Sequence, residues 1–269
     1  MEKEQQNSNA VITENYSLYF GDCLEVMKQI PGNSIDMVLC DLPYGKTACN
    51  WDSVIPFDAL WKQYERIVKE NSAILLFGSE PFSSNLRISN LKLFRYDWIW
   101  QKPYKTLHPR ASFRPLLEHE TISVFYKKQP VYNPQGVIPC DKVIKQKLTT
   151  LKDSVYCNHC FKDTEIYNKK FTNYPSTILK IGEHINKKGR QHLHPTQKDI
   201  SLLEYLIKTY TNEGMVVLDN CMGSGSTGIA CLNTGRKFIG IELDTHYFEV
   251  SKNRLESWEK KENDENGTF

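Results

Sequence analysis

The stretch CDLPYG, residues 40–45, places a carboxylate and an aromatic ring at the end of an apolar run. The run IDMVLCD, residues 35–41, is continuous in the way of strands buried on both faces of a parallel sheet. Such sheets bind ligands beyond the carboxyl ends of their strands. We therefore expect Asp41 at the mouth of a ligand crevice, with the ring of Tyr44 beside it. Taken alone, the tetrapeptide also fits a helix-capping aspartate followed by a core tyrosine.

A glycine-rich loop follows a second apolar strand in VVLDNCMGSGSTG. Gly223, Gly225 and Gly228 have the G-x-G-x-x-G spacing, between a predicted strand and a predicted helix. Glycines allow a tight turn and the close approach of a ligand. Glu242 ends the next predicted strand, 17 residues after Gly225, where an acid can accept hydrogen bonds from ribose hydroxyls. The pattern predicts a site for a cofactor that contains adenosine; the alternative is a tight turn with a surface acid.

Two cofactors fit that pattern, NAD and S-adenosylmethionine. Asp219 comes directly after the strand and four residues before the first glycine. S-adenosylmethionine carries a cationic amino group that a carboxylate can pair with, and it has no phosphate to bind at a helix N-terminus. Asp219 therefore favours S-adenosylmethionine.

The elements that must position these residues alternate between strands and helices. Strands are predicted at 16–20, 35–41, 72–78, 93–101, 120–126, 215–219 and 237–244, and helices at 23–30, 56–70, 80–90, 194–210, after the glycine loop and up to about 258. Alternation of this kind predicts a doubly wound, parallel α/β sheet. Residues 127–190, rich in Lys, Asn, Tyr and Pro, lack clear periodicity and are predicted to be an insertion.

Composition places the chain among ordinary globular proteins, with 40% apolar and 25% charged residues in 269. The charge is uneven: residues 101–200 hold 18 Lys and Arg against 8 Asp and Glu, a net +10, and the remainder carries −8. A basic middle predicts binding to a polyanion, and a solvated lysine-rich surface is the alternative. The N-terminus has no apolar signal region, and no apolar run approaches the roughly 18 residues of a membrane span. We expect a cytoplasmic protein with reduced cysteines.

The two motifs together resemble those of the DNA methyltransferases that modify amino groups. DLPYG precedes the basic insertion, HPTQK at 194–198 and the glycine loop, which is the order of the circularly permuted β class. The resemblance covers about residues 16–258. It implies a seven-stranded S-adenosylmethionine-dependent methyltransferase fold, a double-stranded DNA substrate whose target base is flipped out, and a homodimer as an alternative to a monomer.

The resemblance also assigns residues. In DLPY, Asp41 would accept a hydrogen bond from the target amino group, Leu42 would offer its carbonyl, and Pro43 and Tyr44 would complete the motif, with the tyrosine ring stacking on the base. The cofactor would be held by Asp22, Thr196, Lys198, Asp219, Gly223, Gly225 and Glu242. The family has proline where this chain has Leu42, so the carbonyl is kept and the fixed φ is lost. A second proline of the family is replaced by Asp199, which fits a helix start.

The implied activity is methylation of adenine N6, because cytosine-N4 enzymes more often begin the tetrapeptide with serine. Cytosine-N4 methylation and a non-catalytic DNA-binding protein with the same fold are the alternatives. Neither the recognition sequence nor a partner restriction enzyme follows from one chain.

The domain boundaries follow from these assignments. A methyltransferase domain is expected at 15–126 and 191–258, a DNA target-recognition insertion at 127–190, a flexible tail at 1–14 and a disordered tail at 259–269. Lysines of the insertion would contact phosphates, namely Lys142, Lys145, Lys169, Lys170, Lys187 and Lys188. The CNHC run at 157–160 has zinc-ligand spacing, but a second ligand pair is missing. Cys140, His184, His192 and His194 could complete a site at irregular spacing, so whether Cys157 and Cys160 bind zinc stays open, and no metal ligand is assigned.

Overall fold

The computed structural model describes residues 10–45, 53–147, 166–182 and 197–266. It divides into two compact units, one of residues 1–133 and 177–269 and the other of residues 134–176. The first unit contains both motifs. The second lies within the predicted insertion and contains a two-stranded antiparallel sheet, β7 (Ile138–Lys147) with β8 (Ile166–Thr172).

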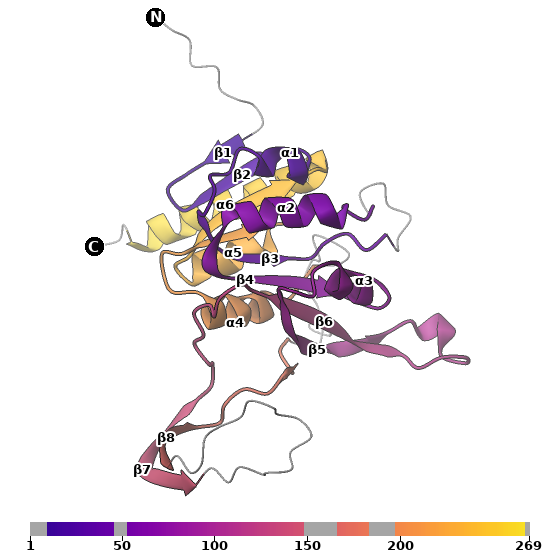
Figure 1. Ribbon diagram of the computed structural model, residues 1–269. Helices are drawn as coiled ribbons and strands as arrows, with labels where there is room; N and C mark the ends of the chain where they lie inside the picture. Colours follow the sequence, from indigo (N-terminus) through magenta and orange to yellow (C-terminus); the bar gives the residue numbers. More distant parts are fainter. Residues whose placement is uncertain (1–9, 46–52, 148–165, 183–196, 267–269) are drawn as a thin grey trace, which may run out of the picture. The chain divides into compact units, whose positions relative to one another are not determined.

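The first unit is built on a nine-stranded sheet in the order β1-β2-β11-β10-β3-β4-β6-β5-β9 (Figure 1). Its strands are β1 (Ala10–Ile12), β2 (Tyr16–Phe20), β3 (Ile35–Cys40), β4 (Val68–Gly78), β5 (Phe94–Thr106), β6 (Leu117–Phe125), β9 (Ile178–Leu179), β10 (Val216–Asp219) and β11 (Lys237–Glu242). The pairs from β2 to β4 are parallel, and β6 runs antiparallel to both β4 and β5. The expected α/β methyltransferase sheet is therefore confirmed, with the short β1 and β9 added at its edges.

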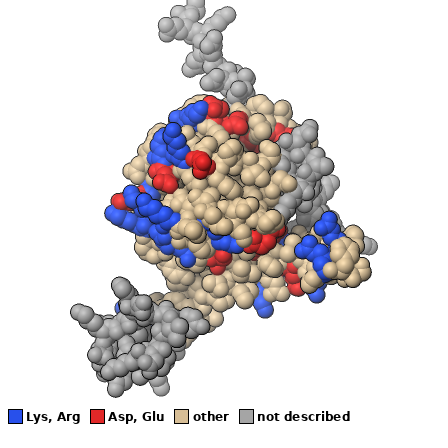
Figure 2. Space-filling model, turned by 45° about the vertical axis from the view of Figure 1, so that its right-hand side comes forward, with Lys and Arg blue, Asp and Glu red and all other residues tan. Residues whose placement is uncertain are grey.

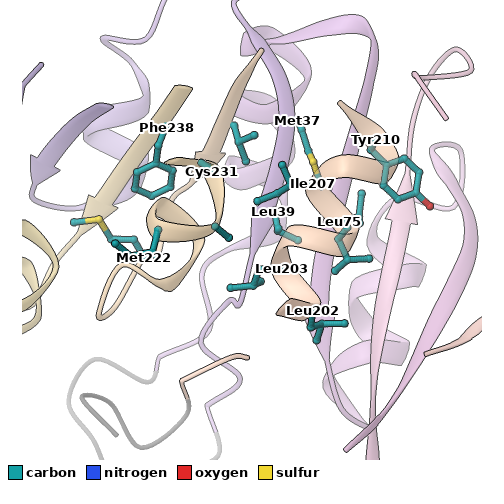
Figure 3. Close-up of a cluster of buried hydrophobic side chains, with 14 of the residues drawn as sticks. Met37, Leu39, Leu75, Leu202, Leu203, Ile207, Tyr210, Met222, Cys231 and Phe238 are labelled. Carbon is teal, nitrogen blue, oxygen red and sulfur yellow. The ribbon is translucent and has the colours of Figure 1, made fainter. Parts of the chain in front are cut away.

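Helices cover both faces of this sheet, as a doubly wound fold requires. They are α1 (Cys23–Met27), α2 (Phe57–Ile67), α3 (Phe82–Ser89), α4 (Ile200–Tyr210), α5 (Ser226–Asn233) and α6 (Thr245–Asn266). Successive residues of a strand point to opposite faces. On β3, Met37 and Leu39 pack with the cluster that includes α4 and α5 (Figure 3), whereas Val38 and Cys40 pack with α1 and α2. Burial on both faces explains why the central strands read as continuous apolar runs.

Several predicted boundaries are wrong. Residues 10–12 pair with β2, so the flexible tail does not extend to 14. The last helix runs to Asn266, so residues 259–266 are helical rather than disordered; Glu and Lys are good helix formers and need no packing partner to extend a helix. Strand β5 continues to Thr106, because its pairing with β6 resumes at Thr106 and Leu117.

Helix α4 begins later in the chain than predicted. Predicted from residue 194, the helix begins at Ile200, with Asp199 as its N-cap accepting from the Ser201 amide at 2.9 Å. This confirms the interpretation of Asp199 as a helix start. It also leaves Gln197 and Lys198 outside the helix, where Lys198 reaches the sheet edge described below.

Candidate active site

A cavity of about 410 Å³ opens at the carboxyl ends of the parallel strands. It is lined by residues that follow β2, β3, β10 and β11, together with strands β5 and β6. All four residues of DLPY line it, as do Asp22, Lys198, Asp219, Gly223 and Glu242. Thus nine of the eleven predicted site residues meet in one place, although the sequence separates them by up to 220 positions.

The other two predicted site residues behave differently. Thr196 lies outside the described residues. Gly225 does not line the cavity: its φ is +75°, and a Cβ there would meet Ser251 and Leu255 of α6 at 3.0 Å. Gly225 therefore allows the turn and the close packing of the loop on α6, and it does not contribute to the wall of the cavity.

Asp41 is held by two partners. The Tyr44 hydroxyl donates to its Oδ1 at 2.5 Å, and the Lys198 ammonium donates to its Oδ2 at 2.6 Å. The Tyr44 ring lies 4.8 Å from the ring of Phe82. Burial raises the pKa of the Tyr44 hydroxyl well above its ordinary value, with the negative charge of Asp41 adding to the effect. Tyr44 is therefore a neutral donor that fixes the carboxylate.

Lys198 connects Asp41 to a second buried carboxylate. Its Nζ lies 3.1 Å from Glu120 Oε2, an ion pair without the alignment of a hydrogen bond, and Glu120 Oε1 accepts from Lys102 at 3.2 Å. Burial alone would lower the pKa of Lys198, but Asp41 and Glu120 outweigh it and raise that pKa. Burial would likewise raise the pKa of Glu120, but Lys198 and Lys102 lower it. Lys198 and Glu120, the central members of the charge network formed by Asp41, Lys198, Glu120 and Lys102, are therefore ionised at neutral pH.

Two members of that charge network were missed from the sequence. Lys102 is on β5 and Glu120 is on β6, and neither belongs to a motif. Only the register of these two strands brings them together, since Trp100 pairs with Glu120 and Gln101 with His119. The segments WQKPYK and LEHE carry opposite charges, which could have indicated cross-strand ion pairs, but only once the two strands are known to form a hairpin.

The glycine loop positions its carboxylates with neutral donors. Asp219 accepts from the Thr227 hydroxyl at 2.6 Å and from the Cys221 amide at 3.1 Å. Burial raises its pKa to about 6 in spite of these donors. Glu242 accepts from the Gly223 amide and the Asp244 amide, each at 2.8 Å. Burial also raises the pKa of Glu242, and the backbone donors only partly offset it.

Asp22 begins helix α1 at the cavity wall. Its Oδ1 accepts from the Leu24 and Glu25 amides at 2.8 and 3.2 Å, so the residue is an N-cap as well as a lining residue. Trp100 lines the cavity and donates to the Ile181 carbonyl at 2.8 Å. Trp98 instead donates to the Tyr210 hydroxyl within the core. Of these two tryptophans of β5, Trp100 lines the cavity and Trp98 does not.

The comparisons with known proteins identify the family. The family model described as N6_N4_Mtase, DNA methylase, matches residues 35–253. The chain belongs to this DNA methylase family. It is 30% identical over 277 residues to the type II methyltransferase M.HinfI of Haemophilus influenzae, covering 91% of this chain and 69% of the relative. It is 24% identical to the DNA adenine methyltransferase YhdJ of Escherichia coli K12, covering 90% of this chain and 83% of the relative.

Solved structures confirm the methylase fold. A complex of M1.HpyAVI with S-adenosylmethionine aligns with a TM-score of 0.59 at 23% identity, covering 89% of this chain and 99% of that one. The cytosine-N4-specific PvuII DNA methyltransferase aligns with a TM-score of 0.65 at 19% identity, covering 90% and 86%. The predicted family and fold are confirmed.

The cofactor of this methylase is S-adenosylmethionine, as predicted. The cavity fits it chemically: Glu242 and Asp22 are acceptors for hydroxyl and amino groups, and the raised pKa of Asp219 reflects a buried carboxylate whose hydrogen-bond donors, in the described segments, are neutral. An ammonium group would supply that missing charge. No cluster of three or more metal-ligating side chains occurs in the part of the chain that is described; the CNHC run lies outside it.

Proposed function

We propose that this methylase transfers a methyl group from S-adenosylmethionine to the N6 amino group of an adenine at a specific site in double-stranded DNA. The observation that carries the proposal is the placement of Asp41 and Tyr44 in the same cavity as Asp219 and Glu242. The aspartate that begins the tetrapeptide favours adenine. Relatives named as adenine-specific, such as YhdJ, support the same choice.

The chain's own groups would orient the amino nitrogen. S-adenosylmethionine supplies an electrophilic methyl group on a sulfonium. Each oxygen of an ionised carboxylate can accept two hydrogen bonds, so Asp41 can still accept an N–H while it is bound to Tyr44 and Lys198. The Leu42 carbonyl would accept the other N–H. Together they direct the nitrogen lone pair and stabilise the positive charge that develops on nitrogen.

The base must leave the duplex to reach these acceptors. Flipping costs a few kcal/mol, and stacking on an aromatic ring returns roughly 1–3 kcal/mol per base. Tyr44 from DLPY and Trp100 and Tyr104 from β5 are aromatic residues that line the cavity. We infer that the base stacks on Tyr44, which Asp41 already fixes in place, with Trp100 as a second wall.

The decisive experiment measures methyl transfer and identifies the product. Purified protein is incubated with genomic DNA and labelled S-adenosylmethionine, and the DNA is then hydrolysed to nucleosides for mass spectrometry. We expect N6-methyladenine from the wild type and none from Asp41→Ala, which should still bind the cofactor. N4-methylcytosine would establish the second candidate, which the PvuII likeness supports. Absence of any methylated base with the wild type would leave the non-catalytic alternative.

The insertion, residues 127–190, is proposed to recognise the target. Within this range, residues 134–176 form the compact unit with β7 and β8, in which Lys170 is exposed, whereas β9 belongs to the nine-stranded sheet of the first unit. The other proposed lysine side chains lie outside the description. Lysines that contact phosphates make affinity fall steeply with salt. Titration of DNA binding against sodium chloride tests this role, which salt-independent binding would exclude.

Cellular role and assembly extend the proposal. Relatives named as type II methyltransferases, M.HpaI and M.HinfI, support a restriction-modification role; DNA methylated by this protein should then resist an endonuclease with the same site. The homodimer and the cytoplasmic location stay predictions, tested by sedimentation and by cell fractionation. No helix in the described segments has the length and apolar character for a membrane span.

A further inference from the structure

The turn between β5 and β6 has a compact shape of its own. It consists of residues 107–116, with the sequence LHPRASFRPL, which we call the hairpin tip. Leu107 has a φ of +67° and leads into a short 3₁₀ turn, His108–Arg110. The Arg110 amide then donates to the Leu107 carbonyl at 2.9 Å, and the Arg114 amide to the Arg110 carbonyl at 3.1 Å. These hydrogen bonds give the tip a defined surface.

That surface is basic. Residues 103–117 contain Lys105, Arg110 and Arg114 and no acidic residue. Arg110 and Arg114 are exposed, and neither forms an ion pair with another described residue. In Figure 2 the blue Lys and Arg side chains gather on this projecting part at the right of the molecule. Unpaired exposed arginines suit a polyanion such as the DNA backbone.

An aromatic residue, Phe113, lies between the two arginines in the sequence. Phe113 is 73% exposed, the highest value among the large hydrophobic residues of the described segments. Its amide donates to the Arg110 carbonyl at 3.2 Å, so the backbone that presents the ring is held. Proteins that bend or open DNA insert apolar side chains such as phenylalanine between base steps. The arginine–phenylalanine–arginine arrangement matches that use.

The hairpin connects the tip to the active site. At its base, Lys102, Tyr104 and Thr106 of β5 line the cavity. β5 ends at Thr106, which pairs with Leu117 at the start of β6, so the hairpin tip begins directly after a residue that lines the cavity and projects from this end of the two strands (Figure 1). A duplex with one base in the cavity would therefore have its neighbouring base pairs and phosphates close to the tip.

We propose that the hairpin tip docks on the DNA substrate, with Arg110 and Arg114 on phosphates and Phe113 inserted in the stack beside the flipped base. The proposal rests on the proposed function, since it needs a flipped base. It assigns the opening of the duplex to the methyltransferase unit itself, whereas the basic insertion holds the flanking DNA. Phe113 then keeps the vacated position from closing.

The first test measures the salt dependence of binding. The double variant Arg110→Ala/Arg114→Ala is compared with wild type on a short fluorescein-labelled duplex titrated with sodium chloride. Each lost phosphate contact lowers the slope of log K against log salt by about 0.9, so we expect a slope lower by about 1.8. The matched control is Lys237→Ala. This exposed lysine is the first residue of β11, at the amino-terminal end of the parallel strands, whereas the cavity lies at their carboxyl ends. A double variant with the wild-type slope would overturn the phosphate contacts.

The second test follows the flipped base. The recognition site is first mapped from DNA methylated by the protein, and 2-aminopurine then replaces the target adenine in a duplex with that site. Wild-type protein should enhance its fluorescence, and Phe113→Ala should lose most of the enhancement, with kcat about tenfold lower and duplex affinity changed much less. Phe113→Trp should restore both signals. The control is Ile12→Ala, 67% exposed on β1 at the far end of the sheet order.

The two proposals fail in different ways. If wild-type protein transfers no methyl group to DNA, the proposed function fails whatever the hairpin does. If wild type methylates DNA and Phe113→Ala matches it in fluorescence and kcat, only the inserted ring is wrong. Each variant should unfold at the wild-type temperature, because all three side chains are exposed. A loss of DNA binding or methylation in such a variant then reflects a lost contact with DNA.

Discussion

The cavity of this methylase holds two pairs of carboxylates in opposite ways. Near DLPY, Asp41 and Glu120 are paired with the ammonium of Lys198, and the pKa of Glu120 is lowered. Near the glycine loop, Asp219 and Glu242 are held by amides and a hydroxyl, and the pKa of each is raised. The first pair has its counterion within the chain. Among the described residues, no cationic side chain forms an ion pair with the second pair, and this is the side on which a cationic cofactor would bind.

The two pairs differ in whether a cation compensates the carboxylate charge before a ligand binds. A permanently paired carboxylate stays ionised and fixed before any substrate arrives, which suits an acceptor that must orient a weak nucleophile. A carboxylate held by neutral donors retains unsatisfied charge, which suits the capture of an ammonium group. Variants that remove a counterion, or pH changes that remove a charge, test this comparison.

The largest effect is expected from Lys198→Met. Removing one partner of a buried ion pair leaves the others uncompensated, so the free energy of unfolding should fall by about 3–5 kcal/mol. Asp41 would also lose a partner, and methylation should be abolished. Urea unfolding and methyl incorporation measure the two effects. The control is Lys69→Met: its ammonium lies 2.7 Å from Asp36, close to the 2.6 Å between Lys198 and Asp41, but the Lys69 side chain is 39% exposed, so a loss below about 1 kcal/mol is expected.

A smaller loss is expected from Glu120→Gln. The amide keeps the shape but removes the charge between Lys102 and Lys198, at a cost of roughly 2 kcal/mol in unfolding free energy. The double variant with Lys198→Met should cost less than the sum of the single changes. Glu118→Gln is the control, because its contact with Lys105 is 3.9 Å and exposed. Strict additivity of the two changes would show that Glu120 and Lys198 act independently.

On the glycine-loop side, pH should control cofactor binding. With a pKa of about 6, Asp219 is protonated below pH 6 and becomes a carboxylate above it. Affinity for the cationic cofactor should therefore rise with pH and be about tenfold weaker at pH 5 than at pH 7. Calorimetric titration of the wild type measures this dependence. Asp219→Asn should bind weakly with little change over the same range; an equal pH dependence in both would assign it to another group.

The smallest effect is expected from Tyr44→Phe. It removes the hydroxyl that donates to Asp41 and keeps the ring that would stack on the base. A net hydrogen bond is worth about 1 kcal/mol, so kcat/KM should fall about fivefold. Tyr44→Ala, which removes the ring as well, should fall much further. Equal losses in the two variants would mean that the ring contributes nothing to catalysis.

The glycine-loop half of this comparison could be predicted from the sequence, and the ion-paired half only in part. Asp219 and Glu242 follow apolar runs that end at a recognisable turn, so local patterns place them. Asp41 and Lys198 were found through their motifs, but their direct contact was not foreseen. Glu120 and Lys102 depend on strand pairing across the hairpin, which no local pattern specifies.

The errors in the fold have the same origin. Apolar periodicity ends near residue 258, yet the helix continues to Asn266 through a charged run that contains good helix formers, and Glu259 accepts hydrogen bonds from Thr13 and Asn15. The strand at Ala10–Ile12 is three residues long and forms only because β2 offers it an edge. The prediction of the central strands is correct, because a strand buried on both faces consists of a continuous apolar run that can be recognised in the sequence.

The pairing of β3 with β10 has a practical consequence. Met37 pairs with Val217 and Val38 with Leu218, so Asp41 and Asp219 end adjacent strands although 178 positions separate them in the chain. The chain leaves the first unit after residue 133 and returns at 177. Cutting it between these points divides the enzyme into two fragments, each with one half of the active site, and strand pairing, helix packing and the Lys198–Asp41 ion pair would rejoin them. The protein is thus a natural starting point for a split methyltransferase whose mark on DNA records the meeting of two fused partners.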